Sequence, residues 1–75
     1  MDWTEAVDAT GLLCPLPVLR ARKRLAGMAP GAVLRLTTTD PAAVVDVPHF
    51  CAEAGHTVLA ESEEGGARVW LIRRR

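Results

Sequence analysis

The sequence lacks most of what could hold a small fold together apart from an aliphatic core. Tyrosine is absent and phenylalanine occurs once among the 75 residues. The 2 cysteines are too few for a disulfide framework. No apolar run approaches the roughly 18–20 residues that span a bilayer, and the acidic start MDWTEAVDA is unlike a signal peptide. We therefore expect one cytoplasmic domain over residues 1–75, without membrane contact.

The chain also lacks an excess of charge. Its 9 basic side chains balance 9 acidic ones, which gives a formal net charge of +0. This balance argues against non-specific binding to nucleic acids. Paired metal-ligand spacing, a C-x-x-C sequence and a glycine-rich phosphate loop are all missing. We therefore expect no metal, no cofactor and no direct nucleic-acid partner.

Hydrophobic periodicity predicts the first half of the fold. Residues 3–9 alternate as a strand does, and residues 15–26 carry a helical apolar stripe that continues to Met28. The basic side chains of this helix lie mainly on its other face, although Arg22 falls near the edge of the stripe. After the Pro30-Gly31 turn signal, the β-branched residues 33–39 predict a second strand.

The second half begins with Asp40-Pro41, which is typical of a helix N-cap followed by a first-turn proline. Pro48 should interrupt this helix, so that a separate helical piece runs over 48–54 and ends at Gly55. Residues 56–62 and 67–74 predict two strands joined by EEGG as a hairpin.

The order β-α-β-α-β-β predicts an α/β two-layer sandwich, with a four-stranded mixed sheet and both helices on one face. In the last strand, either Arg68, Trp70 and Ile72 or Val69 and Leu71 face away from the helices.

Cys14 is the strongest candidate for chemistry. If the helix begins at Pro15, Cys14 is its N-cap, and Pro15 and Pro17 occupy first-turn positions that need no amide donor. The Leu16 amide could then point toward the sulfur, and the helix dipole would favour the thiolate and lower the thiol pKa. Cys51 is expected to be a core residue.

The sequence Cys14-Pro15-Leu16-Pro17 resembles the C-P-x-P signature of the TusA/SirA family of small sulfur carriers. The resemblance continues through Pro30-Gly31, through DPAAVVDVPHFCAEAGH and into the final hairpin, and so covers nearly the whole chain. Leu16 stands where some members have an acidic residue, which makes the approach to Cys14 more apolar.

The resemblance implies a sulfurtransferase component that acts as a carrier rather than as a stand-alone enzyme. Cys14 would accept sulfane sulfur as a persulfide from a cysteine desulfurase or a rhodanese-like donor. It would relay that sulfur to a downstream acceptor in tRNA thiolation, molybdenum cofactor synthesis or sulfur oxidation. We expect a monomer, with Arg22, Lys23 and Asp40 as candidate docking residues for its protein partners.

Two alternatives stay open at this point. A regulatory or nucleic-acid- or protein-binding module would act without sulfur transfer, and would need a strongly basic face to bind nucleic acid. A thiol–disulfide switch would use Cys14 and Cys51 together.

Overall fold

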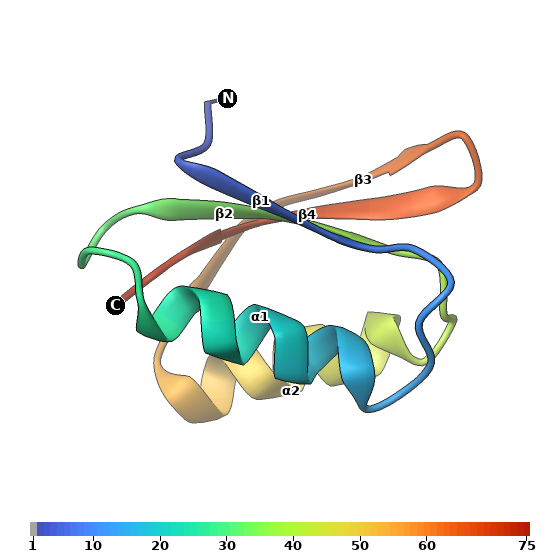
Figure 1. The fold of residues 1–75 in the computed structure, drawn as a ribbon, viewed down its shortest axis with the longest axis horizontal. Coiled ribbons are helices and arrows are strands. Elements are labelled where there is room, and N and C mark those ends of the chain that lie inside the picture. Colours follow the sequence, from blue (N-terminus) through green and yellow to red (C-terminus); the bar gives the residue numbers. More distant parts are fainter. Residues whose placement is uncertain (1) are drawn as a thin grey trace.

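The chain folds into a sheet with two helices beneath one of its faces (Figure 1). The computed structural model describes residues 2–75. Its elements are β1 (Glu5–Ala9), α1 (Leu16–Ala26), β2 (Val33–Thr38), α2 (Ala43–Ala54), β3 (Thr57–Glu64) and β4 (Ala67–Arg73). This order and the two layers confirm the predicted α/β sandwich. Among residues 2–75, no helix is both long enough and apolar enough to cross a membrane.

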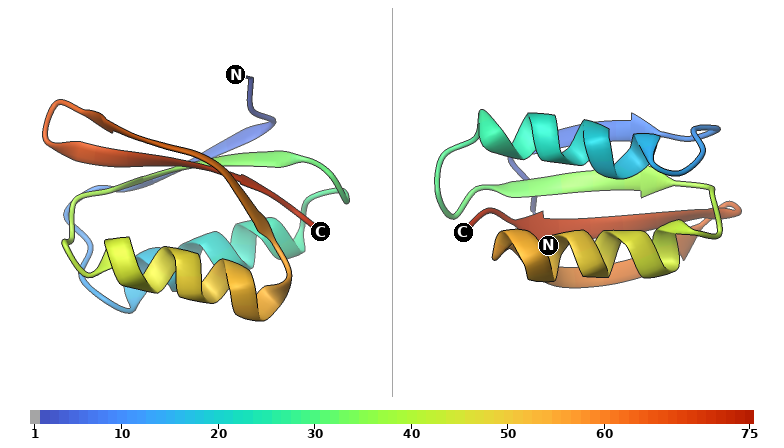
Figure 2. Two further views of the ribbon diagram at one scale, coloured as in Figure 1. Left: turned by 180° about the vertical axis from the view of Figure 1, so that it is seen from behind. Right: turned by 90° about the horizontal axis from the view of Figure 1, so that it is seen from below.

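The sheet has the strand order β1-β2-β4-β3. β1 and β2 are parallel, because α1 carries the chain back across the sheet between them. β4 is antiparallel to both β2 and β3. The mixed sheet therefore has β1 at one edge and β3 at the other, and seen from below α1 and α2 lie side by side (Figure 2).

The core lies between the helices and one row of each strand. Trp70 and Ile72 belong to it, so Val69 and Leu71 lie on the sheet face that no helix covers. The predicted α1 stripe is confirmed, since Ala21, Leu25 and Met28 are buried. The remaining fully or nearly buried members of the core are Val7, Ala9, Leu34, Leu36, Ala43, Val47, Phe50 and Cys51.

One polar contact is sealed within this core. The Trp70 indole N–H donates a hydrogen bond to Thr38 Oγ1 at 3.1 Å. Thr38 is only 1% exposed and Trp70 also 1%, so water cannot replace either partner. The contact satisfies the only polar atom of the largest core side chain, and it joins β2 to β4.

The prediction that Pro48 interrupts the second helix is wrong. α2 runs unbroken over Ala43–Ala54 with Pro48 inside it. Pro48 has no N–H, so the helical hydrogen bond to the Val44 carbonyl is missing. Val44 is exposed, and water can bond to that carbonyl instead. Burial of Val47 and Phe50 on either side of Pro48 holds the helix together. The predicted left-handed ending at Gly55 is confirmed, with φ of 81°.

The final hairpin is also tighter than the sequence suggested. β3 extends to Glu64, so the loop is only Gly65-Gly66 rather than four residues. These glycines have φ of 56° and 84°, the positive values that two-residue hairpin loops require at both positions. The first strand, by contrast, starts at Glu5 instead of residue 3.

Candidate functional site

The parallel pairing of β1 and β2 assembles the site around Cys14. The carboxyl ends of two parallel strands lie at the same edge of a sheet, so the loops that follow them meet there. The Gly11 N–H donates to Thr39 Oγ1 at 2.8 Å, and the Cys14 N–H donates to Asp40 Oδ2 at 2.7 Å. Two bonds thus attach the loop that carries Cys14 to the loop that leads into α2.

Asp40 serves both loops with its two carboxylate oxygens. While Oδ2 accepts from Cys14, Oδ1 accepts from the Ala42 N–H at 3.1 Å. Asp40 therefore supports the turn before α2, although the helix cap itself is Ala42, and the expected N-cap position is wrong by two residues. This one carboxylate links the position of Cys14 to the start of α2.

The local geometry at the start of α1 differs from the prediction. The helix begins at Leu16 with Pro15 as its N-cap, so Cys14, which was expected to be the N-cap, lies one residue before it. The Leu16 N–H donates to the Leu13 carbonyl at 2.9 Å rather than pointing at the sulfur. Of the two prolines, Pro17 is buried and Pro15 is exposed.

The electrostatic environment of Cys14 is opposite to the prediction. The pKa of the exposed Cys14 thiol is raised, first by a hydrogen bond to the Asp46 side chain, then by desolvation and by the charges of Asp46 and Asp40. Sequence reasoning considered only the nearby helix end, which favours the thiolate. The two carboxylates come from the second loop and helix, and both favour the protonated thiol.

Asp46 is the site residue that sequence reasoning missed. A signal for it was present, because Asp46 lies in the first turn of α2. The first turn of the helix after β2 must lie near the first turn of the helix after β1 when those strands are parallel. A parallel pairing of the first two strands therefore predicts that Asp46 lies near Cys14.

A shallow groove runs from Cys14 between α1 and α2. Besides Cys14, it is lined by Pro15, Val18, Arg22, Asp46, His49, Phe50 and Glu53. The Arg22 guanidinium lies 5.5 Å from the centroid of the Phe50 ring, a cation–π distance. We call this surface the Cys14 groove. It combines an apolar floor with one cation and two carboxylates.

The predicted docking residues separate in the structure. Arg22 lines the Cys14 groove, whereas Lys23 lines a different groove on the other side of α1, against β1. Asp40 lies at neither place, but holds the Cys14 amide directly. Leu16 is 46% exposed and Leu13 is 68% exposed, so the surface beside the thiol is apolar, as the sequence indicated.

Cys51 has the opposite character to Cys14. It is 2% exposed in the core, which confirms its predicted packing role. Burial raises the pKa of its thiol to about 11. Both cysteines are free. A buried thiol of this kind is a poor partner in disulfide exchange, because exchange needs an accessible thiolate.

Within residues 2–75, no group of three or more His, Cys, Asp or Glu side chains is arranged to hold a metal ion. The chemistry that the site offers is that of a single accessible thiol. Its backbone is held by Asp40, the nearby Asp46 carboxylate raises the pKa of the thiol, and the thiol is exposed.

The fold and this site define a class of protein: small two-layer α/β sandwiches that present one cysteine at the entry to their first helix. The family model described as "Sulfurtransferase TusA" matches residues 5–74. The chain therefore belongs to the TusA family.

Similar proteins agree with this assignment. The chain is 42% identical to the sulfur carrier protein TusA of Allochromatium vinosum over 97% of this chain and 96% of that protein. It is 45% identical to a putative sulfur carrier protein of Neisseria meningitidis over 92% and 93% of the two chains. The crystal structure of a SirA-like protein from Desulfitobacterium hafniense superposes with a TM-score of 0.83. That structure covers 93% of this chain and 96% of its own at 24% identity, and it supports the fold.

Proposed function

We propose that this protein is a sulfur carrier that holds sulfane sulfur as a persulfide on Cys14. The observation that carries the proposal is the exposed Cys14 thiol on a turn fixed by Asp40, in a chain of the TusA family. Relatives named as sulfur carriers support it. A carrier needs a thiol that two protein partners can reach in turn, and an open groove meets that need better than an enclosed pocket.

The loading step balances without an external oxidant. The donor, a cysteine desulfurase or a rhodanese-like protein, carries a persulfide R–S–SH. The Cys14 sulfur attacks the terminal sulfur of that group, the donor S–S bond breaks, and R–S⁻ leaves. The proton of the Cys14 thiol passes to R–S⁻, which leaves a Cys14 persulfide and a donor thiol. Delivery to the acceptor repeats the exchange with Cys14 as the leaving group.

The carboxylates beside Cys14 affect how readily its thiol gives up its proton in this step. Asp46 and Asp40 raise the thiol pKa, so the free carrier holds mostly the unreactive thiol at neutral pH. A donor that brings cationic groups to this end of the molecule would neutralise the two carboxylates and release the thiolate. We propose that docking of a protein donor therefore speeds loading, and that the free carrier reacts more slowly with small electrophiles.

Docking itself is assigned to the Cys14 groove and its rim. Arg22 would pair with an acidic group of the partner. The exposed side chains of Leu13 and Leu16 would provide apolar contact next to the sulfur. In this proposal Asp40 acts through the Cys14 backbone, and Lys23 takes no part in docking at the thiol. The acceptor pathway, whether tRNA thiolation, molybdenum cofactor synthesis or sulfur oxidation, depends on which partner fits this rim.

Intact-mass spectrometry tests the carrier function. The protein is incubated without reductant, with a cysteine desulfurase and free cysteine in one sample and with inorganic polysulfide in another. The wild type and Cys51→Ala should each gain one sulfur atom, which a reducing agent removes, whereas Cys14→Ser should gain none. Equal gain by Cys14→Ser, or no gain by wild type from either donor, would overturn the proposal.

The same assay tests the docking residue. Arg22→Glu should load more slowly from the desulfurase but at an unchanged rate from polysulfide, which needs no protein contact. Arg73→Glu, a charge reversal at the exposed end of β4, is the matched control and should load like the wild type. A parallel fall with both sulfur sources would show damage to the thiol site instead of lost docking.

A further inference from the structure

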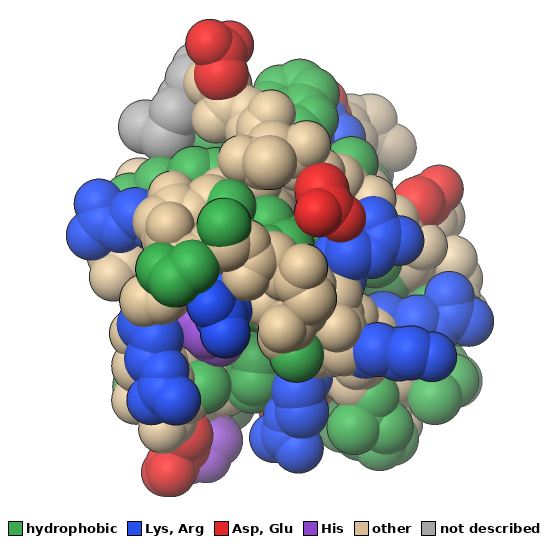
Figure 3. Space-filling model, turned by 60° about the vertical axis from the view of Figure 1, so that its left-hand side comes forward, with side chains coloured by type: hydrophobic (Ala, Val, Ile, Leu, Met, Phe, Trp, Pro, Cys, Tyr) green, Lys and Arg blue, Asp and Glu red, His purple; other side chains and the backbone are tan. Residues whose placement is uncertain are grey.

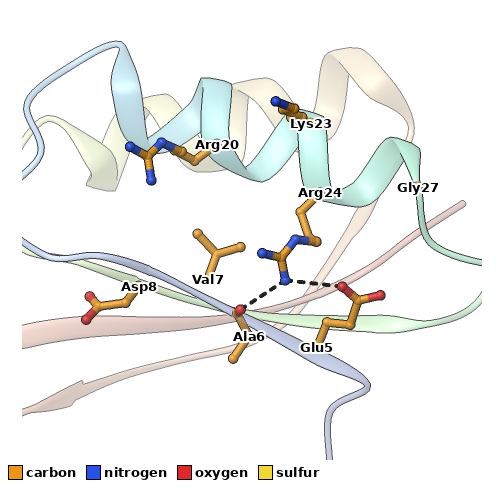
Figure 4. A pocket seen from close by; sticks show the side chains of 8 residues that line it. All are labelled: Glu5, Ala6, Val7, Asp8, Arg20, Lys23, Arg24 and Gly27. Carbon is orange, nitrogen blue, oxygen red and sulfur yellow. Dashed lines mark hydrogen bonds and ion pairs between the residues drawn. The ribbon is translucent and has the colours of Figure 1, made fainter.

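A second groove lies on the other side of α1 from Cys14. β1 supplies one wall with Glu5–Asp8, and α1 supplies the opposite wall with Arg20, Lys23 and Arg24 (Figure 4). We call it the β1–α1 groove. It shares no lining residue with the Cys14 groove, and the carrier function proposed above makes no use of it.

One wall of the β1–α1 groove is the edge of the sheet. Within residues 2–75, β1 pairs with β2 alone, in continuous register from Glu5 opposite Leu34 to Ala9 opposite Thr38. An edge strand presents backbone groups that a further strand could pair with. The Ala6 carbonyl accepts a hydrogen bond from Arg24 Nη1 at 3.3 Å within the groove, so a donor from this side can reach the β1 backbone (Figure 4).

The opposite edge of the sheet, formed by β3, is less open than β1 to the addition of a further strand. β3 has a register irregularity between Val58 and Ala60, which disturbs a regular edge. It also carries Glu61 and Glu63, both ion-paired with Arg68 at 3.4 and 3.1 Å. Bulges and charges of this kind are how proteins prevent strands from adding to an edge. β1 keeps a continuous register along Glu5–Ala9, so it is the edge better suited to the addition of a strand.

The charge of the β1–α1 groove favours an acidic occupant. Arg24 is paired with Glu5 at 3.2 Å, and the Asp8 carboxylate accepts from the Thr10 N–H at 2.9 Å. Among the described residues, Arg20 and Lys23 have no ion-pair partner. On the face drawn in Figure 3, the Lys and Arg side chains lie mainly in the lower half. The groove thus sets the three cations of α1 against the carboxylates of Glu5 and Asp8, which leaves an excess of one positive charge beside an open strand edge.

The geometry of the two walls sets the pattern of the occupant. Side chains on one face of a strand recur every second residue, about 6.6 Å apart. Residues separated by three or four positions on a helix lie about 4.5–6 Å from each other along the helix axis. Arg20 is separated from Lys23 and Arg24 in this way. Carboxylates at alternate positions of an extended segment would therefore match the cations of α1 while its backbone pairs with β1.

We propose that the β1–α1 groove binds an acidic, extended segment of a partner protein as an added fifth strand. The backbone of the segment pairs with β1, and its carboxylates contact Arg20 and Lys23. Arg24 leaves the Ala6 carbonyl to make room and contacts a third carboxylate. Because the groove and Cys14 lie on different sides of α1, a bound segment leaves the thiol accessible.

Fluorescence anisotropy with short labelled peptides tests the proposal. The probe is a peptide of about seven residues that alternates Glu and Thr. One comparison peptide replaces every Glu by Lys, and another keeps the acidic sequence but N-methylates alternate backbone nitrogens. The wild type should bind the acidic peptide at least about tenfold more tightly than either comparison peptide, a difference that corresponds to ~1.4 kcal/mol. Equal binding of the N-methylated peptide would exclude strand addition.

Paired charge reversals locate the site. Arg20→Glu with Lys23→Glu should weaken binding of the acidic peptide at least about tenfold. Arg73→Glu with Arg74→Glu, an equal change of charge outside the groove, should alter it by less than about twofold. Amide shifts in ¹⁵N NMR spectra should centre on Glu5–Ala9 and the facing turns of α1. Equal effects of the two double variants, or shifts centred on the Cys14 groove, would overturn the proposal.

Two further outcomes separate this inference from its alternatives. Concentration-dependent shifts at β1 and at the acidic edge of β3, without any peptide, would make a second copy of this chain the occupant and so contradict the proposal. Loading of Cys14 by polysulfide should be the same in Arg20→Glu/Lys23→Glu as in the wild type. A failure of the groove therefore leaves the carrier function intact, and a failure of loading leaves the groove intact.

Discussion

Replacement of Asp40 should loosen the Cys14 turn and the start of α2 together. Asp40→Ala removes two hydrogen bonds, at 2.7 Å from the Cys14 N–H and at 3.1 Å from the Ala42 N–H. Loss of the bond from the Ala42 N–H, in the turn before α2, costs about 1 kcal/mol. Loss of one partly exposed bond to a charged acceptor costs about another 1 kcal/mol, below the value for buried sites. The free energy of unfolding should therefore fall by about 2 kcal/mol.

Asp40→Asn should reduce the free energy of unfolding by about half as much as Asp40→Ala. An amide has one acceptor oxygen, so it can replace one of the two bonds, and the loss should be about 1 kcal/mol. In a chain of this size, each 1 kcal/mol lowers Tm by roughly 4–8 °C. Asp40→Ala should thus melt roughly 10 °C below the wild type, with Asp40→Asn about halfway between them.

Thermal and urea unfolding followed by circular dichroism measure these differences, and hydrogen exchange locates them. The Gly11 and Cys14 amides should exchange faster in Asp40→Ala. Glu53→Gln is the control, because it removes a carboxylate whose side chain is 72% exposed. A Tm of Asp40→Ala within about 2 °C of the wild type, or unchanged exchange at Cys14, would refute the view that Asp40 holds the turn.

Three more predictions follow from individual contacts. Asp46→Asn should lower the pKa of Cys14, since Asp46 is the main cause of its elevation. The pH at which iodoacetamide labelling of Cys14 sets in, measured in a Cys51→Ala background, should therefore shift to a lower value. An unshifted pH profile would contradict this. Burial and the charges of Arg75 and Arg74 lower the pKa of His56, so the unfolded state binds the proton more readily. The wild type should therefore lose stability relative to His56→Gln as pH falls below about 6.5 in urea titrations, and equal pH dependence would exclude this linkage. Thr38→Val should cost about 1–3 kcal/mol by leaving the buried Trp70 N–H unpaired, while Thr38→Ser keeps an acceptor; equal losses would point to packing instead.

Local patterns in the sequence predicted most of the fold. The stripe through Ala21 and Leu25 and the left-handed ending at Gly55 follow from spacing and glycine chemistry, and both are confirmed. Pro48 was misread because a local rule was applied without the burial of Val47 and Phe50, which only the tertiary structure supplies.

The candidate site was predictable in position but not in electrostatics. Cys14 was identified as the candidate for chemistry at the entry to the first helix, and the structure shows that its thiol is exposed there. Its carboxylate neighbours were not, because Asp40 lies 26 residues further along the chain and reaches Cys14 only through the parallel strand pair. The pKa of an exposed group depends on such distant charges as much as on its own segment.

The parallel pairing of β1 and β2 also affects how the chain behaves during synthesis. A parallel contact across an intervening helix closes a long loop, so it forms late compared with local turns. Until it forms, Asp40 and Asp46 are not held near the sulfur, and Cys14 has the reactivity of an ordinary peptide cysteine. Pairing of the first two strands is then the event that brings the carboxylates to the sulfur and raises the pKa of the thiol.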